Sequence, residues 1–520
     1  MSAGPALFPD VLLDVAAVAS DAVIVQLMKA NKFLYREAAK YLLDLILISI
    51  EDEMDLDSMV SFLSVYGGYR LVFLKGLGLN MSALSACIAK RLDALLKTHH
   101  DKIRIKGFQI SHVESLLMGC PVVANLISRL STLEVIELSE VGVFGSDMLR
   151  RSQSQFHTVE VNWNPVSGEE TDQRSPIILL SHSKSSLRSL TATGASLLSG
   201  LFSPSNIYPS LTHLTLRYSD GLVTTILAQV FPNLTVLDIA PPVRQVEAAE
   251  ASEFDMHRRM NILKQGARGS WPSLQKATAL LFDFYALGIL CPIRELRIRG
   301  PHTIRPSAFL DVLTHARPVH LCLERHEAGL FTPEIIHTLH SACAARTECF
   351  EVILSVGGLL APARINGPAL VVRPFPHLTS LAACIARISR AAHPPQESWI
   401  EAVRALPRLR ALDIAVQSFL PGPVPVRSRA RQRSVASSSS ASDPGRFSAE
   451  VFFAALDLDA LARRFREAVP ALQTVALSLG GVRGRAPAFV RCGEPLPEFE
   501  TSGAEAVRLF QEIMGGMRIG

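Results

Sequence analysis

Apolar residues recur along the middle of the chain in a short pattern, with one apolar position followed by two more at three and five residues further on. Four segments follow the pattern most clearly, and each begins with proline: PSLTHLTL, PNLTVLDI, PRLRALDI and PALQTVAL. The last two apolar positions are separated by a single residue, which is the alternation of a strand with one buried face. The pattern therefore predicts one short strand in each copy.

The residues expected to be buried share this spacing in every copy. In the four clear copies they are Leu211, Leu214 and Leu216, then Leu234, Leu237 and Ile239, then Leu409, Leu412 and Ile414, and finally Leu472, Val475 and Leu477. Weaker copies are Leu133/Ile136/Leu138, Phe156/Val159/Val161, Leu187/Leu190/Ala192 and Ile293/Leu296/Ile298, and two segments, Val319/Leu321/Leu323 and Phe350/Val352/Leu354, keep the final pair only. Central copies lie roughly 20 to 30 residues apart, a period typical of repeat architectures.

Segments with helical spacing separate the strand copies. Residues 221–231 (GLVTTILAQVF) and the run from Phe309 to His315 after Pro306 are two examples. Each repeating unit is therefore predicted as strand, loop, helix and return. One such unit cannot bury its own apolar face, so about ten stacked units would form a parallel sheet on the inside and helices on the outside.

This repeat resembles the leucine-rich repeat family, whose pattern is L-x-x-L-x-L-x-x-N/C-x-L, over roughly residues 100 to 480. The position that is usually Asn or Cys is Ser219 in one copy and Pro242 in the next, so the repeats resemble the irregular kind. The resemblance implies an α/β fold, an irregular leucine-rich-repeat solenoid with parallel strands inside and helices outside. The alternative is a single large α/β domain with a parallel sheet.

The first 50 residues lack the strand pattern and favour short helices. Residues 8–15 (FPDVLLDV) place proline at a helix start, where its missing N–H costs nothing. A second helix is expected from Asp21, a suitable N-terminal cap, and a third from Leu34 to Leu47.

These helices resemble the F-box. Phe8-Pro9-Asp10-Val11-Leu12 stands for its opening motif, Leu27-Met28 for its middle apolar pair and Lys32-Phe33-Leu34-Tyr35 for its closing motif, with departures at Phe8 and Asn31. The resemblance implies a hydrophobic interface with a Skp1-like linker subunit of a cullin-based ubiquitin ligase. The expected interface residues are Phe8, Pro9, Leu12, Leu13 and Leu27. If the segment instead only caps the repeats, Leu12 and Leu13 should be buried against the first repeat.

The expected organisation has five parts. They are an F-box-like helical segment (1–50), a helical connector or first cap (51–100), a leucine-rich-repeat-like solenoid (101–420), an Arg/Ser-rich disordered linker (421–446), and a final repeat with a C-terminal cap (447–520). The linker carries five arginines and a run of four serines, a composition that cannot pack a core.

Composition and charge narrow the class of protein. Hydrophobic residues make up 48% of the chain and charged residues 19%, which indicates a folded protein with a large core. The net charge of +4 favours neither a nucleic-acid partner nor a membrane surface. The eight cysteines include no C-x-x-C pair, the N-terminus lacks a signal-peptide pattern, and the apolar stretch 41–50 is interrupted by Asp44. We therefore expect a cytoplasmic or nuclear protein with reduced thiols.

Motifs for phosphate binding, dinucleotide binding, nucleophilic hydrolysis and zinc proteolysis are absent from the sequence. His326-Glu327 lacks the second histidine of a zinc motif, and Cys343 and Cys349 point to nearly opposite faces of a helix. We therefore expect no catalytic residue, no metal and no cofactor. The rival hypothesis of an α/β enzyme predicts a deep pocket with converging titratable groups.

In a leucine-rich repeat, the residues between the buried strand positions face the concave surface. Glu137, Glu160, Arg217, Asp238, Arg297 and Arg299 are therefore the expected substrate-binding residues. Acidic residues dominate the early copies, and Arg297 with Arg299 should form a basic patch later. Mixed charge suits a protein substrate. The expected function is that of a substrate-recognition adaptor of a Skp1-cullin-type ubiquitin ligase, and the alternative is a repeat scaffold without a ligase role.

Overall fold

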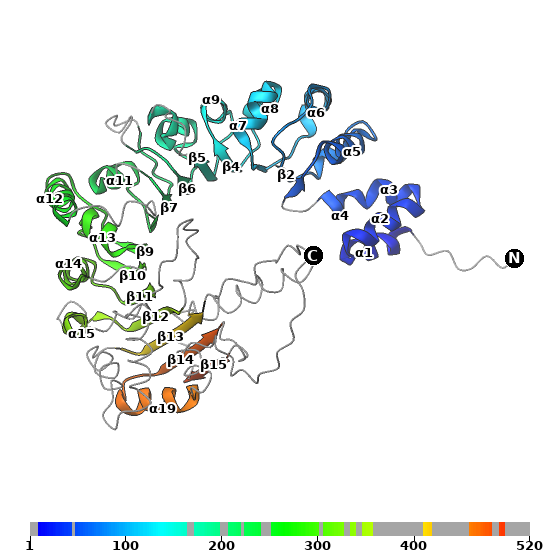
Figure 1. Cartoon of the computed structure of the whole chain (residues 1–520). Coiled ribbons are helices and arrows are strands. Elements are labelled where there is room, and N and C mark those ends of the chain that lie inside the picture. The colour runs from blue at the N-terminus through cyan, green and yellow to red at the C-terminus, as the bar shows by residue number, and fades with distance from the viewer. Residues whose placement is uncertain are drawn as a thin grey trace, which may run out of the picture. The chain divides into compact units, whose positions relative to one another are not determined.

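The computed structural model describes residues 9–43, 47–163, 171–197, 206–219, 223–240, 251–300, 305–326, 333–339, 346–356, 409–418, 457–480 and 488–493. The chain divides into two compact units, residues 1–249 and 250–520. Both are mixed α/β structures with mostly parallel sheet (Figure 1). Phe8, the linker 421–446 and most of the expected C-terminal cap lie outside the described residues.

The described residues of the first unit form a sheet of eight parallel strands in chain order. They are β1 (Ile48–Ile50), β2 (Gly76–Leu79), β3 (Gly107–Ile110), β4 (Val135–Val141), β5 (Thr158–Trp163), β6 (Ser189–Thr193), β7 (His213–Arg217) and β8 (Val236–Ala240). Each strand pairs with the one before it and the one after it in sequence. This is the connectivity that right-handed strand–helix–strand units produce when they are placed side by side.

In the described residues, helices occupy every interval between these strands except that between β6 and β7, and they lie on one side of the sheet (Figure 1). They are α5 (Glu53–Ser64), α6 (Ala86–Thr98), α7 (Val113–Gly119), α8 (Pro121–Arg129), α9 (Val143–Arg150), α10 (Pro176–Leu179) and α11 (Thr224–Val230), with single-turn helices η1 (Tyr69–Val72), η2 (His100–Lys102), η3 (Thr171–Arg174) and η4 (Ser181–Ser183). Four further helices precede β1: α1 (Pro9–Val18), α2 (Asp21–Ala30), α3 (Lys32–Glu37) and α4 (Ala39–Leu43).

In the part of the second unit that the structure describes, six parallel strands are followed by one antiparallel strand. They are β9 (Leu274–Leu280), β10 (Ile293–Arg299), β11 (His320–His326), β12 (Cys349–Val356), β13 (Ala411–Ser418), β14 (Thr474–Gly480) and the antiparallel β15 (Ala488–Cys492). Its helices are α12 (Ala251–Arg268), α13 (Leu281–Leu287), α14 (Pro306–Ala316), α15 (Pro333–Leu339) and α19 (Leu458–Ala468). None of the described helices of either unit is both long and apolar enough to cross a membrane.

Every predicted strand copy is confirmed, because each coincides with one of these strands. The apolar residues at the predicted spacing form the core of each copy. Leu211, Leu214 and Leu216 are buried in the copy that contains β7, and Leu234, Leu237 and Ile239 are buried in the copy that contains β8. The strands turn these residues toward the helices, and the residues between them lie on the opposite face of the sheet. The predicted helix after Pro306 is also confirmed, with proline in its first turn.

Two expectations differ from the structure. The strand–helix alternation begins at β1, earlier than residue 101. Both β1 and β2 also carry the apolar spacing of the later copies, as Leu45/Ile48/Ile50 and Leu74/Leu77/Leu79, so the repeat starts before the copies predicted from the sequence. The helix expected from Leu34 to Leu47 is wrong, since α3 ends at Glu37 and α4 ends at Leu43. The break falls at Ala38 and Ala39, which are completely buried, and their small side chains allow the chain to turn in close contact with its neighbours.

Candidate interaction surfaces

The N-terminal helices form a small core of their own. Its buried residues are Ala16, Ile24, Met28, Ala38 and Ala39, and partly buried Leu13, Ala19, Leu27, Tyr35, Tyr41, Leu42 and Phe62 pack against it. Phe62 belongs to α5, so this core is continuous with the first strand–helix unit. Asn31 accepts a hydrogen bond from the backbone N–H of Phe33 and so caps α3.

Arg70 of η1 contacts both this core and the first strand–helix unit. Its side chain is completely buried, and Nη1 donates to the carbonyl oxygen of Phe62 over 2.9 Å. Nη2 donates to the carbonyl of Tyr35 on α3. The guanidinium also lies 3.9 Å from the Phe62 ring centroid and 4.3 Å from that of Tyr35. Cation–π contact and hydrogen bonding therefore hold α3 against α5 at one residue.

The residues expected to contact a linker subunit are only partly available. Leu12, Leu13 and Leu27 are all half-buried, and Leu13 and Leu27 pack against the N-terminal core. Pro9 begins α1. Leu12, Leu13 and Leu27 are therefore neither fully exposed nor fully buried.

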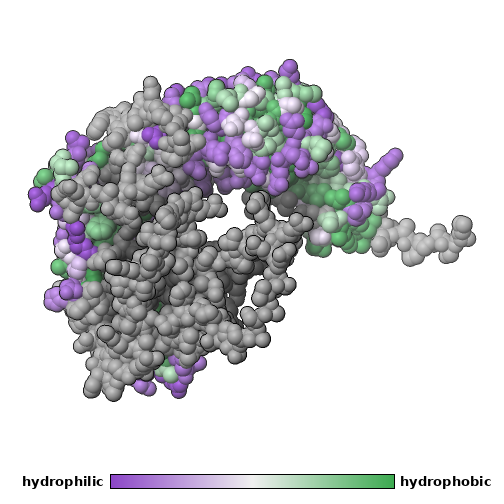
Figure 2. Space-filling view, in the orientation of Figure 1, coloured by the Kyte–Doolittle hydropathy of each residue, from purple (hydrophilic) through white to green (hydrophobic). Residues whose placement is uncertain are grey.

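Other apolar residues of the same helices are exposed. They are Val11, Val15 and Val18 on α1, Val23 and Val25 on α2, and Phe33 on α3, and Val18 is the most open, with 87% of its surface exposed. We call these six residues the N-terminal apolar surface. Figure 2 shows green over these helices. These six residues differ from the predicted set, because α1 is apolar on most of its circumference and spacing alone does not show which side packs.

The sheet face of the first unit carries a row of polar side chains across successive strands, interrupted only at Gly78 of β2. Paired positions give the row Ser49, Gly78, Gln109, Glu137, Glu160, Thr191, Thr215 and Asp238. Three of the predicted substrate-binding residues, Glu137, Glu160 and Asp238, thus belong to a single row. We call it the polar row.

Glu137 and Glu160 are directly paired neighbours in the polar row, on β4 and β5. Glu137 is half-buried and Glu160 exposed. Burial, together with the charge of Glu160, raises the pKa of Glu137 above its ordinary value. A cation placed between the two carboxylates would relieve this repulsion, so the row favours a positively charged ligand group.

Arg217 lies in the next row toward the ends of the strands. It pairs in register with Thr193 of β6 and Ala240 of β8, and its side chain is exposed. Arg217 is therefore not in the same row as the three acids, although it lies on the same sheet.

Arg297 and Arg299, in the second unit, do not form the expected basic patch. Arg297 is buried, with its guanidinium nitrogens 3.3 Å from a carboxylate oxygen of Glu351, 3.5 Å from Glu295 and 3.8 Å from Glu324. Nε of Arg299 lies 3.4 Å from Glu324. Three carboxylates thus offset the charge of two guanidinium groups. The sequence alone did not indicate this, because the three acids lie on three different strands.

Glu351 on β12 is the most buried member of this cluster. Its Oε2 lies 3.4 Å from Nε2 of His320 as well as near Arg297. Burial alone would raise the pKa of Glu351, but His320 and Arg297 outweigh burial and hold that pKa below its usual range. The cluster is therefore an internal ion-pair network, which fixes the register of β10 to β12 and offers little to a ligand.

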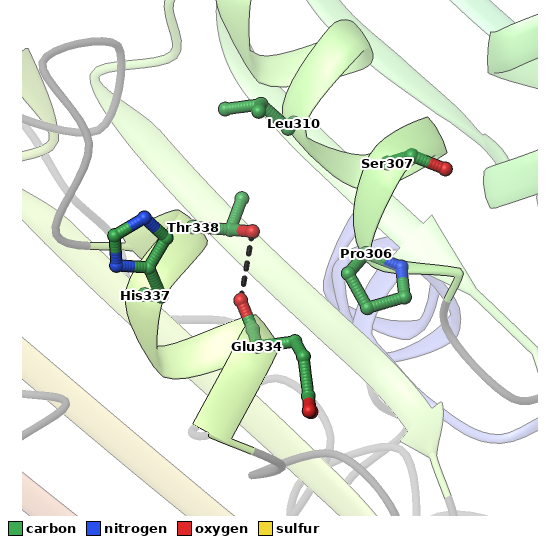
Figure 3. A pocket seen from close by; sticks show the side chains of 6 residues that line it. All are labelled: Pro306, Ser307, Leu310, Glu334, His337 and Thr338. Carbon is green, nitrogen blue, oxygen red and sulfur yellow. Dashed lines mark hydrogen bonds between the residues drawn. The ribbon is translucent and has the colours of Figure 1, made fainter.

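A hollow of about 390 Å³ lies between α14 and α15 (Figure 3). It is lined by Pro306, Ser307, Leu310, Glu334, His337 and Thr338. The Thr338 hydroxyl donates to the carbonyl of Glu334 over 2.9 Å, a bond within α15. Most of the surface that lines the hollow belongs to apolar atoms. The titratable side chains of Glu334 and His337 do not contact each other there (Figure 3).

Comparison with known proteins finds no matching family model, and no curated protein is significantly similar in sequence.

Proposed function

We propose that this protein is a substrate-recognition adaptor of a Skp1-cullin-type ubiquitin ligase. Its N-terminal helices would dock the linker subunit, and the face of its leucine-rich-repeat-like sheet would bind a protein substrate. The observation that carries the proposal is the N-terminal apolar surface: six large apolar side chains stand exposed on three short helices. Exposed apolar groups that share one side of a helix, as Val11 and Val15 do on α1, mark interaction sites.

The geometry of this segment supports a docking role. Val11 and Val15 are four residues apart on α1 and therefore lie on the same side of the helix. A helical partner could pack against them while Leu13 and Leu27 hold the small core behind. Arg70 fixes that core to α5, so a docked linker subunit would keep a constant position relative to the neighbouring strands.

The polar row supports the substrate role. Glu137, Glu160 and Asp238 give the sheet face of the first unit an acidic character, which favours a basic segment of a protein substrate. An adaptor of this kind does no chemistry of its own. It raises the effective concentration of a substrate lysine near the ubiquitin-carrying enzyme.

A second candidate is a repeat scaffold whose N-terminal helices only cap the sheet. The packing of Leu13 and Leu27 against the N-terminal core favours it, because terminal repeats need a cap. The two candidates differ in what they predict for the exposed residues, since a pure cap gives Val15 and Phe33 no partner.

Co-purification of the full chain with a Skp1-like protein tests the proposal. The variant Val15→Ser with Phe33→Ser removes two exposed members of the N-terminal apolar surface and spares Leu13, whose loss would damage the core. Met54→Ser on α5, also exposed, is the matched control.

The proposal expects binding by the wild type and by Met54→Ser, and a loss of at least about tenfold in affinity for the double variant. All three proteins should have the same circular dichroism and melting temperature. Absence of binding by the folded wild type would favour the scaffold. Binding that survives in the double variant would place the interface elsewhere.

A further inference from the structure

Helix α12 in the second unit turns a polar side inward. Arg258, Asn261 and Gln265 are all buried, and their spacing of three and four residues places them on the same side of the helix. An outer helix of an α/β protein usually buries its apolar side instead.

These buried groups are satisfied by the last turn of α13. Asn261 Nδ2 donates to the carbonyl of Ala286 over 2.9 Å, and Gln265 Nε2 donates to that of Gly288 over 2.8 Å. Arg258 Nη1 donates to the carbonyl of Tyr285 over 3.2 Å. The end of a helix leaves carbonyls without partners, and α12 supplies donors to them. Polar contacts thus hold α12 firmly in place.

Three apolar residues of α12 face outward, whereas Phe254 stacks on Phe282 of α13 and Ile262 is half-buried. Met256, Met260 and Leu263 are 57%, 48% and 69% exposed. At 100° per residue they fall within a sector of about 60°. We call these three residues the α12 stripe. Over α12, Figure 2 shows green atoms beside purple ones.

Basic residues border the α12 stripe. Arg259 is exposed and Lys264 half-buried, and the helical period places them on opposite sides of the stripe. The sequence of α12 contains four basic residues against two acidic ones, a net charge of +2 with histidine neutral. Of the acids, Asp255 accepts a hydrogen bond from the hydroxyl of Tyr285 and is thereby drawn toward α13.

We propose that the α12 stripe is a docking site for an acidic amphipathic helix of a partner protein. Apolar side chains of that helix would pack on Met256, Met260 and Leu263, and its carboxylates would meet Arg259 and Lys264. Methionine side chains adapt to the shape of their partner, which suits such a contact. The site does not depend on a ubiquitin-ligase role.

The narrowness of the stripe favours a protein helix over a membrane surface. Three apolar residues in one row match the ridge of a single helix, whereas a helix that lies in a membrane interface needs a wide apolar face. The polar side of α12 is held by α13, so the helix cannot roll to bury more apolar surface.

Selection from a library of randomised helical peptides on the folded full chain tests the site. The test variant is Met260→Ser with Leu263→Ser, and the control is Met118→Ser, which removes an exposed methionine of α7 in the first unit. A second variant, Arg259→Gln with Lys264→Gln, removes the charge and leaves the stripe. Melting temperatures of all variants should match the wild type, because the altered side chains are on the surface.

The expected result is enrichment of peptides with acidic residues around an apolar ridge. Their affinity should fall at least about tenfold on the stripe variant, be unchanged on Met118→Ser, and weaken with added salt on the wild type but less on the charge variant.

Three results would overturn the proposal. One is the absence of any peptide sensitive to the stripe variant. Another is stripe-dependent binding to phosphatidylserine vesicles without peptide binding, which would assign the site to a membrane. The third is a dimer in sedimentation that the stripe variant abolishes, which would assign it to a second copy of the chain.

Discussion

Buried polar side chains in this protein differ in how well their surroundings satisfy them. Arg70 lies among aromatic rings and donates to two carbonyl groups. Asp283, in the first turn of α13, has an Oδ2 atom that is shielded from solvent and accepts no hydrogen bond. An unsatisfied buried group is costly when it carries charge, so the contribution of Asp283 to stability should depend on pH.

Burial raises the pKa of Asp283 to about 7, although a backbone hydrogen bond from Leu280 opposes the shift. The folded state therefore binds the Asp283 proton more tightly than the unfolded state does. The stabilisation is complete below the unfolded pKa near 3.8 and is lost as the pH rises through about 7.

Asp283→Asn should consequently make the protein more stable than the wild type, and the gain should be larger at pH 8 than at pH 5. Urea unfolding at the two pH values measures the gain. A gain that does not change with pH would show that Asp283 is ionised in the folded protein at both values.

At the scale of the element, the start of α9 depends on a neighbouring helix. Its cap position is Gly142, which has no side chain to satisfy the first backbone N–H groups. Glu114 of α7 does so instead: its carboxylate accepts from Gly142 over 2.9 Å, from Phe144 over 3.0 Å and from Gly145 over 3.3 Å. A negative charge at that end also suits the helix dipole.

Glu114→Ala should lower the free energy of unfolding by about 1 to 2 kcal/mol, because it removes a cap and a favourable charge together. Glu114→Gln keeps an acceptor oxygen and should lose less. Chemical denaturation of the two variants measures both losses. Equal losses would mean that only the charge matters at this position.

Much of the element pattern is predictable from sequence. Strands with the triple apolar spacing, such as β7 and β8, are found where the pattern predicts them, because their alternation reflects one buried face. Strands β1 and β2 carry the same spacing, as Leu45/Ile48/Ile50 and Leu74/Leu77/Leu79, but two features make it harder to recognise. In the sequence β1 lies inside the apolar run 41–50, and β2 has glycine at the positions between its leucines.

The interaction surfaces are less predictable, for a physical reason. Spacing shows which residues share a side of a helix and does not show whether that side packs. Met256, Met260 and Leu263 would be assigned to the core by their spacing alone, and only the carbonyls at the end of α13 explain why the opposite side of α12 is buried. The polar row was partly predicted, because strand alternation places Glu137 and Glu160 opposite the core.

At the scale of the whole molecule, pairing between sequence neighbours makes stability local. In the described sheet of the first unit, each strand is stabilised by the strands and helices next to it in the chain. A substitution that destabilises one strand should therefore destabilise only that strand and its neighbours in the sheet.

Leu138→Ala in β4 should cost about 3 kcal/mol, because Leu138 is fully buried between β3 and β5. Amide hydrogen exchange should then accelerate in β3 to β5 and stay unchanged in β10 to β12. Leu296→Ala in β10 is the matched control and should give the reverse pattern. Faster exchange in both units from either change would mean that they unfold as one.

The order of the strands also bears on how such a protein evolves. Within the parallel ladder of the first unit, inner strands such as β5 and β6 receive their partners from the preceding and following segments of the gene. Duplication or loss of one strand–helix segment would leave the remaining pairs with partners of the same kind. Lineages can therefore lengthen or shorten the ladder one segment at a time, and the polar row would gain or lose one residue at each step.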